Sequence, residues 1–259
     1  MKRYIKRQLK KCQRYADPNT IFIYQMGKVG STTLENAIAG SLHIHAFYSK
    51  NSTCVIRQKG LNKFGFRAIF YTLEREISDF IHRIIFKRRA HTKIITLVRE
   101  PIARNQSMFF HDIDAYLFSV HTNCLNTRRT PLPTRSQPKL LLEKVFNEEF
   151  DHFYPLNWFD KEFKPMTGVD IYSKAFNKEL GYSLIDNKGV SVLCISIDKL
   201  DDLTSVIEEF IGHKLVLLKD NNSENKWYSE LYKQFRQHYQ LPSNIEKTIK
   251  ISKFYQHFF

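Results

Sequence analysis

The order of apolar and polar positions along the chain predicts an α/β fold. Short apolar runs rich in β-branched residues occupy 21–23, 93–98 and 190–197, and each is typical of a buried strand. The stretch 41–48 predicts a further strand, and segments with helical periodicity fall at 33–39, 73–90 and 202–211. Strands that alternate with helices are typical of a parallel sheet covered on both faces. We therefore expect a three-layer sandwich with a central parallel sheet flanked by helices.

The chain divides into a short basic lead-in and one domain. Residues 1–20 hold seven lysines and arginines before position 15 and no acidic residue before Asp17. Ile5, Leu9 and Cys12 are spaced as on one face of a helix, so this segment is interpreted either as a basic amphipathic helix or as a solvated lead-in. Residues 21–259 are predicted to form a single α/β domain.

Composition limits the partners that this chain can have. The net charge of +14 in 259 residues favours an anionic ligand or surface. The four cysteines are far apart and form no CxxC pair, which predicts reduced thiols, no metal cluster and a cytoplasmic protein. No run approaches the roughly 20 apolar residues of a membrane span. Peripheral contact with an anionic membrane through residues 1–15 is the expectation that the basic start adds.

A glycine-bearing turn between the first predicted strand and its helix has the composition of a phosphate-binding loop. At such a turn the first backbone N–H groups of the helix have no partner inside the helix, and the helix dipole adds positive charge there. Two glycines let the backbone approach a ligand, a lysine adds a full charge, and three hydroxyl side chains add donors. The residues of this loop are Gly27, Lys28, Val29, Gly30, Ser31, Thr32 and Thr33.

The loop does not fit the usual nucleotide triphosphatase motif. That motif, GxxxxGK[ST], has its lysine directly before the hydroxyl residue that binds magnesium, whereas Lys28 precedes Ser31 by three positions. The order lysine, valine, glycine, serine, threonine, threonine instead resembles the 5′-phosphosulfate loop of sulfotransferases. The family resemblance implies a P-loop-like sulfotransferase fold in which Lys28 and the loop backbone hold the phosphosulfate.

A second candidate anion site follows the strand predicted at 93–98. Arg99 ends this strand, Pro101 suits the first position of a helix, and Ser107 comes about two turns later. If the two strands are neighbours, Arg99 lies near the first loop, because ligands of open α/β sheets bind at the carboxyl ends of the strands. The pattern Arg99, Pro101, Arg104, Ser107 resembles the 3′-phosphate site of sulfotransferases. The resemblance implies that Arg99 and Ser107 bind that phosphate.

Histidines provide the candidate for acid–base chemistry. His43 and His45 lie two positions apart on the second predicted strand, 41–48, and therefore share a face, with His45 closer to the carboxyl end. A histidine there is suited to act as a general base, and sulfotransferases use a histidine or a glutamate for this purpose. We expect His45 to be the base, with His43 or an acidic residue as the alternative. No third ligand at a telling spacing accompanies the two histidines, so no metal site is expected.

Taken together, the resemblance implies a sulfotransferase. The donor would be 3′-phosphoadenosine 5′-phosphosulfate (PAPS), with no metal, and the product a sulfate ester of a hydroxyl group. The run Asn225, Lys226, Trp227, Tyr228, Ser229 resembles a small bacterial family described as capsular polysaccharide synthesis proteins. That resemblance implies a glycan acceptor, a polysaccharide or a glycolipid. The polar stretch 126–138, with three prolines and three arginines, is interpreted as a loop or lid.

Two other classes of function are compatible with a basic chain that carries a phosphate loop. One is a nucleotide-dependent kinase with an atypical loop, although Arg99 stands where a magnesium-binding aspartate is expected. The other is a basic protein that binds nucleic acid or another polyanion through its charge. About half of the net charge lies before residue 15, so that class predicts polyanion binding through the N-terminus. Nucleic acid is not the partner we expect.

Overall fold

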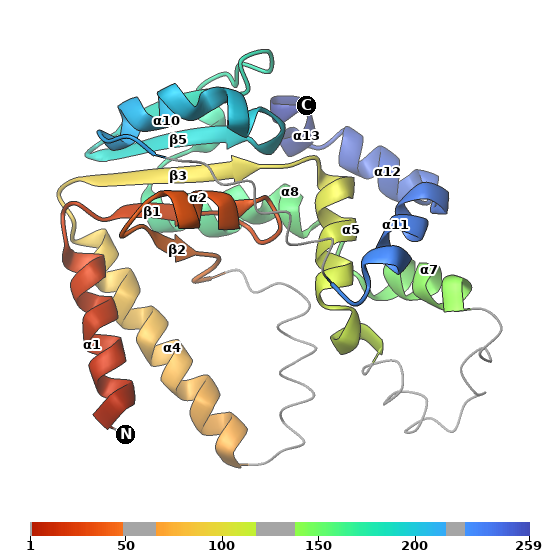
Figure 1. Ribbon diagram of the computed structural model, residues 1–259, viewed down its shortest axis with the longest axis horizontal. Helices are drawn as coiled ribbons and strands as arrows, with labels where there is room; N and C mark the ends of the chain where they lie inside the picture. The colour runs from red at the N-terminus through yellow and green to blue at the C-terminus, as the bar shows by residue number, and fades with distance from the viewer. Residues whose placement is uncertain (1, 49–65, 118–137, 216–225) are drawn as a thin grey trace.

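The computed structural model describes residues 2–48, 66–117, 138–215 and 226–259, and their centre is a five-stranded sheet (Figure 1). The strand order is β2-β1-β3-β5-β4, and the first four strands in this order are parallel. The predicted α/β architecture is therefore confirmed. The strands are β1 (Ile21–Tyr24), β2 (Leu42–Ile44), β3 (Thr92–Val98), β4 (Tyr182–Asn187) and β5 (Val190–Ser196).

The edge strand β4 corrects the expectation of a wholly parallel sheet. It pairs with β5 in the antiparallel sense, with Asn187 opposite Val190. Only Lys188 and Gly189 connect the two strands, and both have positive φ, of 46° and 85°. Two successive residues with positive φ favour a tight hairpin whose twist matches that of the strands. The sheet is thus mixed, with an antiparallel hairpin closing one side.

Helices cover both faces of the sheet, as the three-layer prediction requires. Phe22 and Tyr24 of β1 point to one face, where their rings contact Phe86 and Trp158 at centroid distances of 4.9 and 5.4 Å. On the other face, Lys93 of β3 donates a hydrogen bond to the Phe210 carbonyl in the helix after β5. The helices are α1 (Lys2–Ala16), α2 (Ser31–Ala37), α4 (Phe66–Lys87), α5 (Pro101–His111), α7 (Pro138–Glu149), α8 (Tyr154–Trp158), α9 (Lys164–Thr167), α10 (Thr204–Ile211), α11 (Ser229–His238), α12 (Ser243–Lys250) and α13 (Lys253–Phe258), and shorter turns of π or 3-10 helix lie at Phe159–Phe163 (η2), Ile171–Ser173 (η3) and Ile197–Leu203 (η4).

Several boundaries differ from those that periodicity predicts. Helix α4 begins at Phe66 rather than at 73 and ends at Lys87, and α2 begins two residues earlier than expected, directly after Gly30. Helix α10 ends at Ile211 before Gly212, whose φ of 87° caps it as glycine at that position predicts. The interpretation of 126–138 as a loop concerns residues that are mostly outside the described part of the chain.

Two hydrophobic clusters stabilise these elements. The larger one surrounds the sheet and includes the aromatic residues that follow Asp151, among them Trp158, Phe159 and Phe163, each at most 1% exposed. The smaller one joins α5, α7 and α11 through residues such as Phe109, Phe146 and Phe235. The second cluster anchors α5, which begins beside the carboxyl end of β3 (Figure 1).

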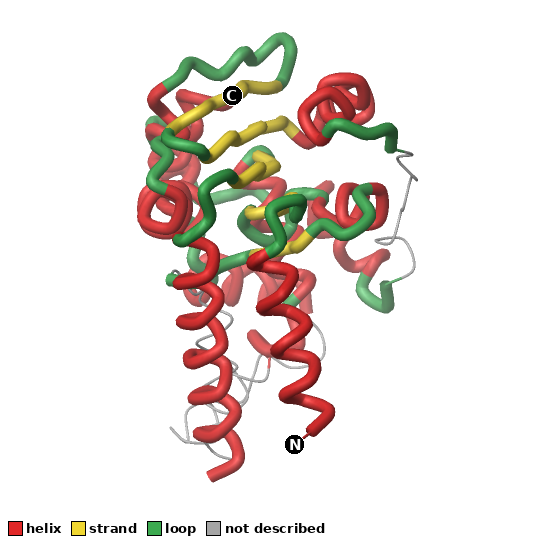
Figure 2. Tube along the Cα trace, turned by 90° about the vertical axis from the view of Figure 1, so that its left-hand side faces the viewer, coloured by secondary structure: helices red, strands yellow, loops and turns green. Residues whose placement is uncertain are grey.

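Helices α1 and α4 form an arm that extends away from the sheet (Figures 1 and 2). They lie side by side, and Gln8 of α1 accepts a hydrogen bond from Ser78 of α4 at 3.0 Å. Residues 2–16 are helical, as the amphipathic interpretation of the lead-in predicts. Within the described residues, neither of these helices nor any other has the length and apolar character that a membrane span requires.

Candidate anion-binding site

The register of the sheet brings the glycine-bearing loop and Arg99 together. Strands β1 and β3 are adjacent and parallel, with Ile23 opposite Ile95, so their carboxyl ends reach the same edge. There Arg99 Nη1 donates a hydrogen bond of 3.1 Å to the Lys28 carbonyl oxygen. Strand β2 lies on one side of β1 and β3 on the other, which makes this edge the point where the chain direction across the sheet reverses.

The loop backbone has a conformation that few residues adopt. Lys28 has φ of 70° and Gly30 has φ of 89°, both in the left-handed region. A Cβ atom on Gly30 would lie 2.2 Å from Ile197 Cδ1, so any other residue would have to displace that side chain as well as adopt a left-handed φ. Val29 is fully buried and anchors the loop. Helix α2 then starts at Ser31, so the first-turn N–H groups of Ser31 to Thr33 are at the loop.

A buried arginine lies beneath the loop. Arg104 of α5 is 1% exposed, and its Nε donates to the Gly27 carbonyl at 3.0 Å while Nη1 donates to Asn105 Oδ1 at 3.1 Å. Its Nη2 has no hydrogen-bond partner among the described residues. Burial lowers the pKa of Arg104 to about 10, so the guanidinium is still charged at neutral pH. A buried charge with a donor left over is unfavourable unless an anion or water pairs with it.

Lys28 is surrounded by like charges. Its pKa is lowered first by partial burial and then by the positive charges of Lys226, Arg99 and Arg104, while Asp112 acts in the opposite direction. The part of the pKa shift that comes from Lys226, Arg99 and Arg104 reflects a local field that is unfavourable for cations. The same field is favourable for an anion, whose negative charge would raise the pKa of Lys28 again.

Lys226 comes from the far end of the sequence, and sequence reasoning assigned it no role at this site. It belongs to the run that continues with Trp227, Tyr228 and Ser229. Tyr228 is 9% exposed, and its ring lies 6.0 Å from that of Phe110 on α5, which anchors the run to the helix that carries Arg104. The run that resembles the capsule family thus adds a cation close to Lys28. Arg104 was noted in the pattern after Arg99, but its burial was not apparent from its spacing.

The hydroxyl side chains of the predicted site are less clearly engaged. Thr32 is exposed and Thr33 is half-buried in the first turn of α2. Ser107 is half-buried in the second turn of α5. The hydrogen bonds of the described residues do not link Ser107 to Arg99 or to Lys28. Its assignment to an anion site therefore stays a prediction.

His45 borders the loop on the side of β2. A Cβ atom on Gly27 would lie 4.0 Å from the His45 ring, and His45 Nδ1 is 3.3 Å from the Gln25 carbonyl oxygen. Because a carbonyl only accepts, this contact favours the tautomer with the proton on Nδ1 and the lone pair on Nε2. Desolvation, and then the neighbouring His43, lower the pKa of His45 to about 4, so the ring is neutral at pH 7 and able to accept a proton.

His43 lies beside His45, as the predicted strand face requires. The two ring centroids are 4.2 Å apart, and His43 Nδ1 is 3.1 Å from Glu35 Oε2 on α2. The strand itself is shorter than the predicted 41–48, since β2 ends at Ile44. Its partner β1 ends at Tyr24, opposite Ile44, and farther along the chain the backbone N–H groups of Phe47 and Tyr48 donate to Glu162, a fully buried carboxylate. This contact takes those groups away from the sheet.

A further polar group is buried at the same edge. Gln25 directly follows β1 and is fully buried, and neither atom of its amide group has a hydrogen-bond partner among the described residues. Its backbone N–H donates to the Ile44 carbonyl at 3.1 Å, which holds the start of the loop against β2. Unpaired buried amides in native proteins call for an explanation such as water or a ligand. Gln25 and Arg104 both place such groups next to the loop.

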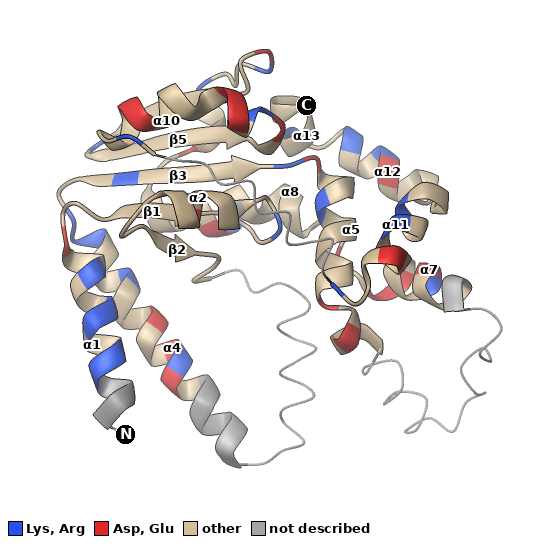
Figure 3. Ribbon diagram, in the orientation of Figure 1, with Lys and Arg blue, Asp and Glu red and all other residues tan. Residues whose placement is uncertain are grey.

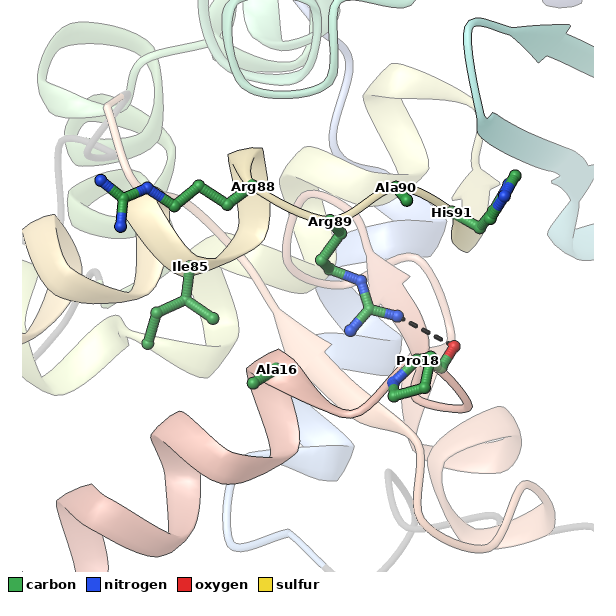
Figure 4. A pocket seen from close by; sticks show the side chains of 7 residues that line it. All are labelled: Ala16, Pro18, Ile85, Arg88, Arg89, Ala90 and His91. Atoms are coloured by element: carbon green, nitrogen blue, oxygen red, sulfur yellow. Dashed lines mark hydrogen bonds between the residues drawn. The ribbon is translucent and has the colours of Figure 1, made fainter.

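A pocket at the opposite, amino-terminal edge of the sheet has a structural explanation (Figure 4). Arg89 lies in it and donates to the carbonyl oxygens of Tyr15, Asp17 and Pro18, at 2.8, 2.5 and 3.1 Å. These hydrogen bonds tie the turn between α1 and β1 to the end of α4. Since the guanidinium is already engaged, this edge is not the candidate site. The lining residues are Ala16, Pro18, Ile85, Arg88, Arg89, Ala90 and His91.

Comparison with known proteins relates one part of the chain to a family. Residues 136–259 match the family model NKWYS, described as putative capsular polysaccharide synthesis protein. The match includes Lys226 and excludes the loop around Lys28 and Arg99. No curated protein and no solved structure matches the chain significantly. The comparisons thus relate slightly less than half of the chain to capsular polysaccharide synthesis, and they identify no particular reaction for it.

Proposed function

We propose that this chain is a sulfotransferase that moves a sulfuryl group from PAPS to a hydroxyl group of a glycan. The observation that carries the proposal is the convergence of Lys28, Arg99 and Arg104 at one edge of the sheet, between β1 and β3. Hydrogen bonds from Arg99 and Arg104 to the carbonyl oxygens of Lys28 and Gly27 hold both arginines against the loop, and no described carboxylate forms a salt bridge with any of the three cations. Such a cluster is suited to a ligand with more than one anionic group.

The residues present fit a donor with two anionic ends. Lys28 and the first-turn N–H groups of α2 would hold the 5′-phosphosulfate, and Arg99 with Ser107 on α5 would hold the 3′-phosphate. Arg104 Nη2, which has no hydrogen-bond partner in the described part of the chain, would supply a further donor beneath the loop. Lys226 would close the cluster from the other side. ATP lacks the 3′-phosphate, so the position of Arg99 is what would distinguish the two nucleotides.

The chain's own residues suit a direct displacement at sulfur. PAPS, when bound, supplies a sulfuryl group whose bond to the 5′-phosphate oxygen breaks as the acceptor oxygen bonds to sulfur, which releases adenosine 3′,5′-bisphosphate. His45 Nε2 would take the acceptor proton, since Nδ1 faces a carbonyl. Lys28 would stabilise the negative charge left on the phosphate. The anionic ligand would also raise the pKa of His45 toward neutrality and improve it as a base.

The proposed acceptor class rests on the family match. A capsular polysaccharide synthesis family offers sugar hydroxyls as acceptors, and His45 marks the side of the loop from which such a hydroxyl would approach. His43 and Glu35 lie behind His45 and would position its ring. We assign His43 a positioning role in the proposed reaction.

Calorimetric titration of the full chain tests the donor site. We expect tight binding of adenosine 3′,5′-bisphosphate and much weaker binding of AMP, because AMP lacks the 3′-phosphate. Lys28→Ala and Arg99→Ala should each weaken binding by about 10- to 100-fold, the equivalent of one charge-assisted hydrogen bond. Arg88→Ala, an exposed arginine at the opposite edge of the sheet, is the matched control and should bind like the unmodified chain.

The same titration separates the alternatives. A preference for ATP with magnesium would replace the proposal by the kinase interpretation. Binding that is indifferent to both substitutions, together with heparin or DNA binding that disappears when residues 1–15 are removed, would replace it by the polyanion interpretation. If the donor binds as expected, His45→Ala should lower kcat for sulfate transfer to a glycan without changing the affinity for the bisphosphate.

A further inference from the structure

The backbone at His45 lies beyond the paired strands of the sheet. The register between β1 and β2 ends with Tyr24 opposite Ile44, so His45 and the residues after it are outside this pairing. Backbone groups that are buried outside a sheet need other hydrogen-bond partners. Two side chains from a distant part of the chain, Trp158 and Glu162, provide such partners here.

Trp158 and Glu162 hold the chain from His45 to Tyr48 by its backbone. Trp158 Nε1 donates a hydrogen bond of 3.2 Å to the His45 carbonyl oxygen. Glu162 accepts the backbone N–H groups of Phe47 and Tyr48, in the second case at 2.7 Å. Both side chains are fully buried, and hydrogen bonds inside a protein are stronger than those in contact with water. The segment is therefore attached to the core at three backbone positions.

These two side chains come from an unusual turn of helix. Trp158 ends α8, and Glu162 lies in η2, the π-helical turn at Phe159–Phe163. Single turns of π-helix are rare, and they are frequent at functional sites. Residues four positions apart on a helix lie on the same side, so one short element presents both side chains to the segment that carries His45.

Stability alone does not account for a carboxylate at position 162. Its surroundings are aromatic: Tyr24 donates a hydrogen bond to Glu162, and the rings of Trp158 and Phe163 each lie 5.4 Å from the Tyr24 ring. Desolvating a carboxylate in such a core is unfavourable, and replacing a buried charged group by an apolar one of similar volume is often neutral or stabilising. What the carboxylate adds is geometry, because its two oxygens accept the N–H groups of two successive residues and so specify one path of the backbone.

This path determines where the His45 ring lies relative to the anion-binding loop. The ring is 4.0 Å from the Cβ position of Gly27, and Nδ1 is 3.3 Å from the Gln25 carbonyl oxygen. A misplacement of about 1 Å at a reacting group can lower a rate on the order of 100-fold. We propose that Trp158 and Glu162 are positioning residues, which hold His45 in the orientation that directs Nε2 toward the acceptor. The inference rests on the proposed function in one respect, the role of His45 as the base.

NMR titration of the His45 ring in the full chain tests this positioning without any substrate. Trp158→Phe removes the indole N–H and changes no charge. Desolvation is the main cause that lowers the pKa of His45 to about 4, so a ring released toward water should have a pKa closer to 6.5. Its neutral form should also mix the two tautomers instead of keeping the proton on Nδ1. The matched control is Phe163→Leu, which removes volume from the same cluster but no hydrogen bond, and it should leave the titration unchanged.

Glu162→Gln separates the effect of position from the effect of charge. The charges that act most on the His45 ring come from His43 on β2, Glu35 on α2 and Arg104 on α5 (Figure 3). If Glu162 acted only as one more negative charge, its removal would lower the pKa of the ring further. If it positions the backbone, the pKa should rise, because the amide has a single oxygen and its NH₂ group would face one of the two N–H groups.

Hydrogen exchange of the unmodified chain adds a test that needs no variant. The amides of Phe47 and Tyr48 should be protected like those of the core strands, because their acceptor is buried. Rapid exchange of both amides would overturn the proposal. So would a His45 titration that Trp158→Phe leaves unchanged, or one that Phe163→Leu changes to the same extent.

The transfer reaction connects the positioning to catalysis. If adenosine 3′,5′-bisphosphate binds as expected, Trp158→Phe should lower kcat for sulfate transfer by about tenfold or more and leave the affinity for the bisphosphate unchanged. An unchanged kcat would overturn the proposal. A chain that does not bind the bisphosphate would instead refute the proposed function, and the titration of His45 would still decide whether Trp158 and Glu162 position its ring.

Discussion

Replacing Gly30 by alanine probes the geometry that holds the anion-binding loop. Two unfavourable contributions are expected at this position. The left-handed φ of 89° destabilises an alanine by about 1–2 kcal/mol. In addition, the new methyl group would lie 2.2 Å from Ile197 Cδ1, and such overpacking destabilises by about 1–3 kcal/mol. We therefore expect Gly30→Ala to lower the free energy of unfolding by about 2–5 kcal/mol.

Gly40 provides a matched control for the backbone contribution. Its φ is 77°, but nothing lies within 4 Å of a Cβ atom built on it. Gly40→Ala should therefore show the conformational contribution alone, about 1–2 kcal/mol. The difference between the two variants isolates the contact with Ile197. Urea unfolding followed by circular dichroism measures both, and unchanged m-values would show that the unfolded states are comparable.

A double-mutant cycle tests the contact directly. Ile197→Ala removes the methyl group that would clash, so Gly30→Ala should be less destabilising in that background, with a coupling of about 1–3 kcal/mol. Gly30→Ala alone should also weaken bisphosphate binding at least tenfold, whereas Gly40→Ala should not. The reasoning is refuted if the two glycine variants are equally stable, or if Ile197→Ala does not reduce the effect of Gly30→Ala.

Two further predictions concern Lys28 and His82. Lys28→Gly should leave the protein equally stable or up to about 1 kcal/mol more stable, because glycine tolerates a φ of 70° and the repulsion from Arg99 disappears. It should nevertheless lose bisphosphate binding. A clear loss of stability in urea unfolding would contradict the reasoning that Lys28 is strained by its positive φ. His82 is buried against Tyr15, and burial lowers its pKa from 6.5 to about 4. Below pH 6.5 the unfolded chain therefore binds more protons than the folded chain, and the free energy of unfolding falls as the pH drops toward 4. Between pH 7 and pH 5, protonation of His82 should lower the free energy of unfolding by about 2 kcal/mol. His82→Phe should abolish this loss. If the variant and the unmodified chain lose equal stability, His82 is not the group responsible.

Local patterns in the sequence determined four of the five strands and the composition of the loop, whereas no strand was predicted at β4, Tyr182–Asn187. The apolar runs at 21–23, 93–98 and 190–197 form β1, β3 and β5 within one residue of the expected limits, because burial on both faces of a parallel sheet requires continuous β-branched residues. The turn before α2 was recognisable because glycines, a lysine and hydroxyl residues between a strand and a helix are a short-range signal.

Contacts between residues far apart in the sequence decided the backbone contacts after β2, the position of Lys226 and the burial of Arg104. Glu162 accepts the backbone N–H groups of Phe47 and Tyr48, more than 100 positions away, so these groups do not join the sheet. Lys226 is close enough to lower the pKa of Lys28, and the packing of Tyr228 on α5 holds its segment there. The burial of Arg104 beneath the loop depends likewise on where α5 docks.

The arm illustrates the same division between sequence and tertiary structure. Periodicity showed that α4 has an apolar face, but a helical pattern by itself does not say what that face meets. Only the docking of α1 on the opposite side of α4, through Ser78 and His82, left Leu73, Ile77 and Phe80 exposed. Periodicity depends on residues three or four positions apart, whereas the choice of partner depends on chain segments that only the folded structure brings together.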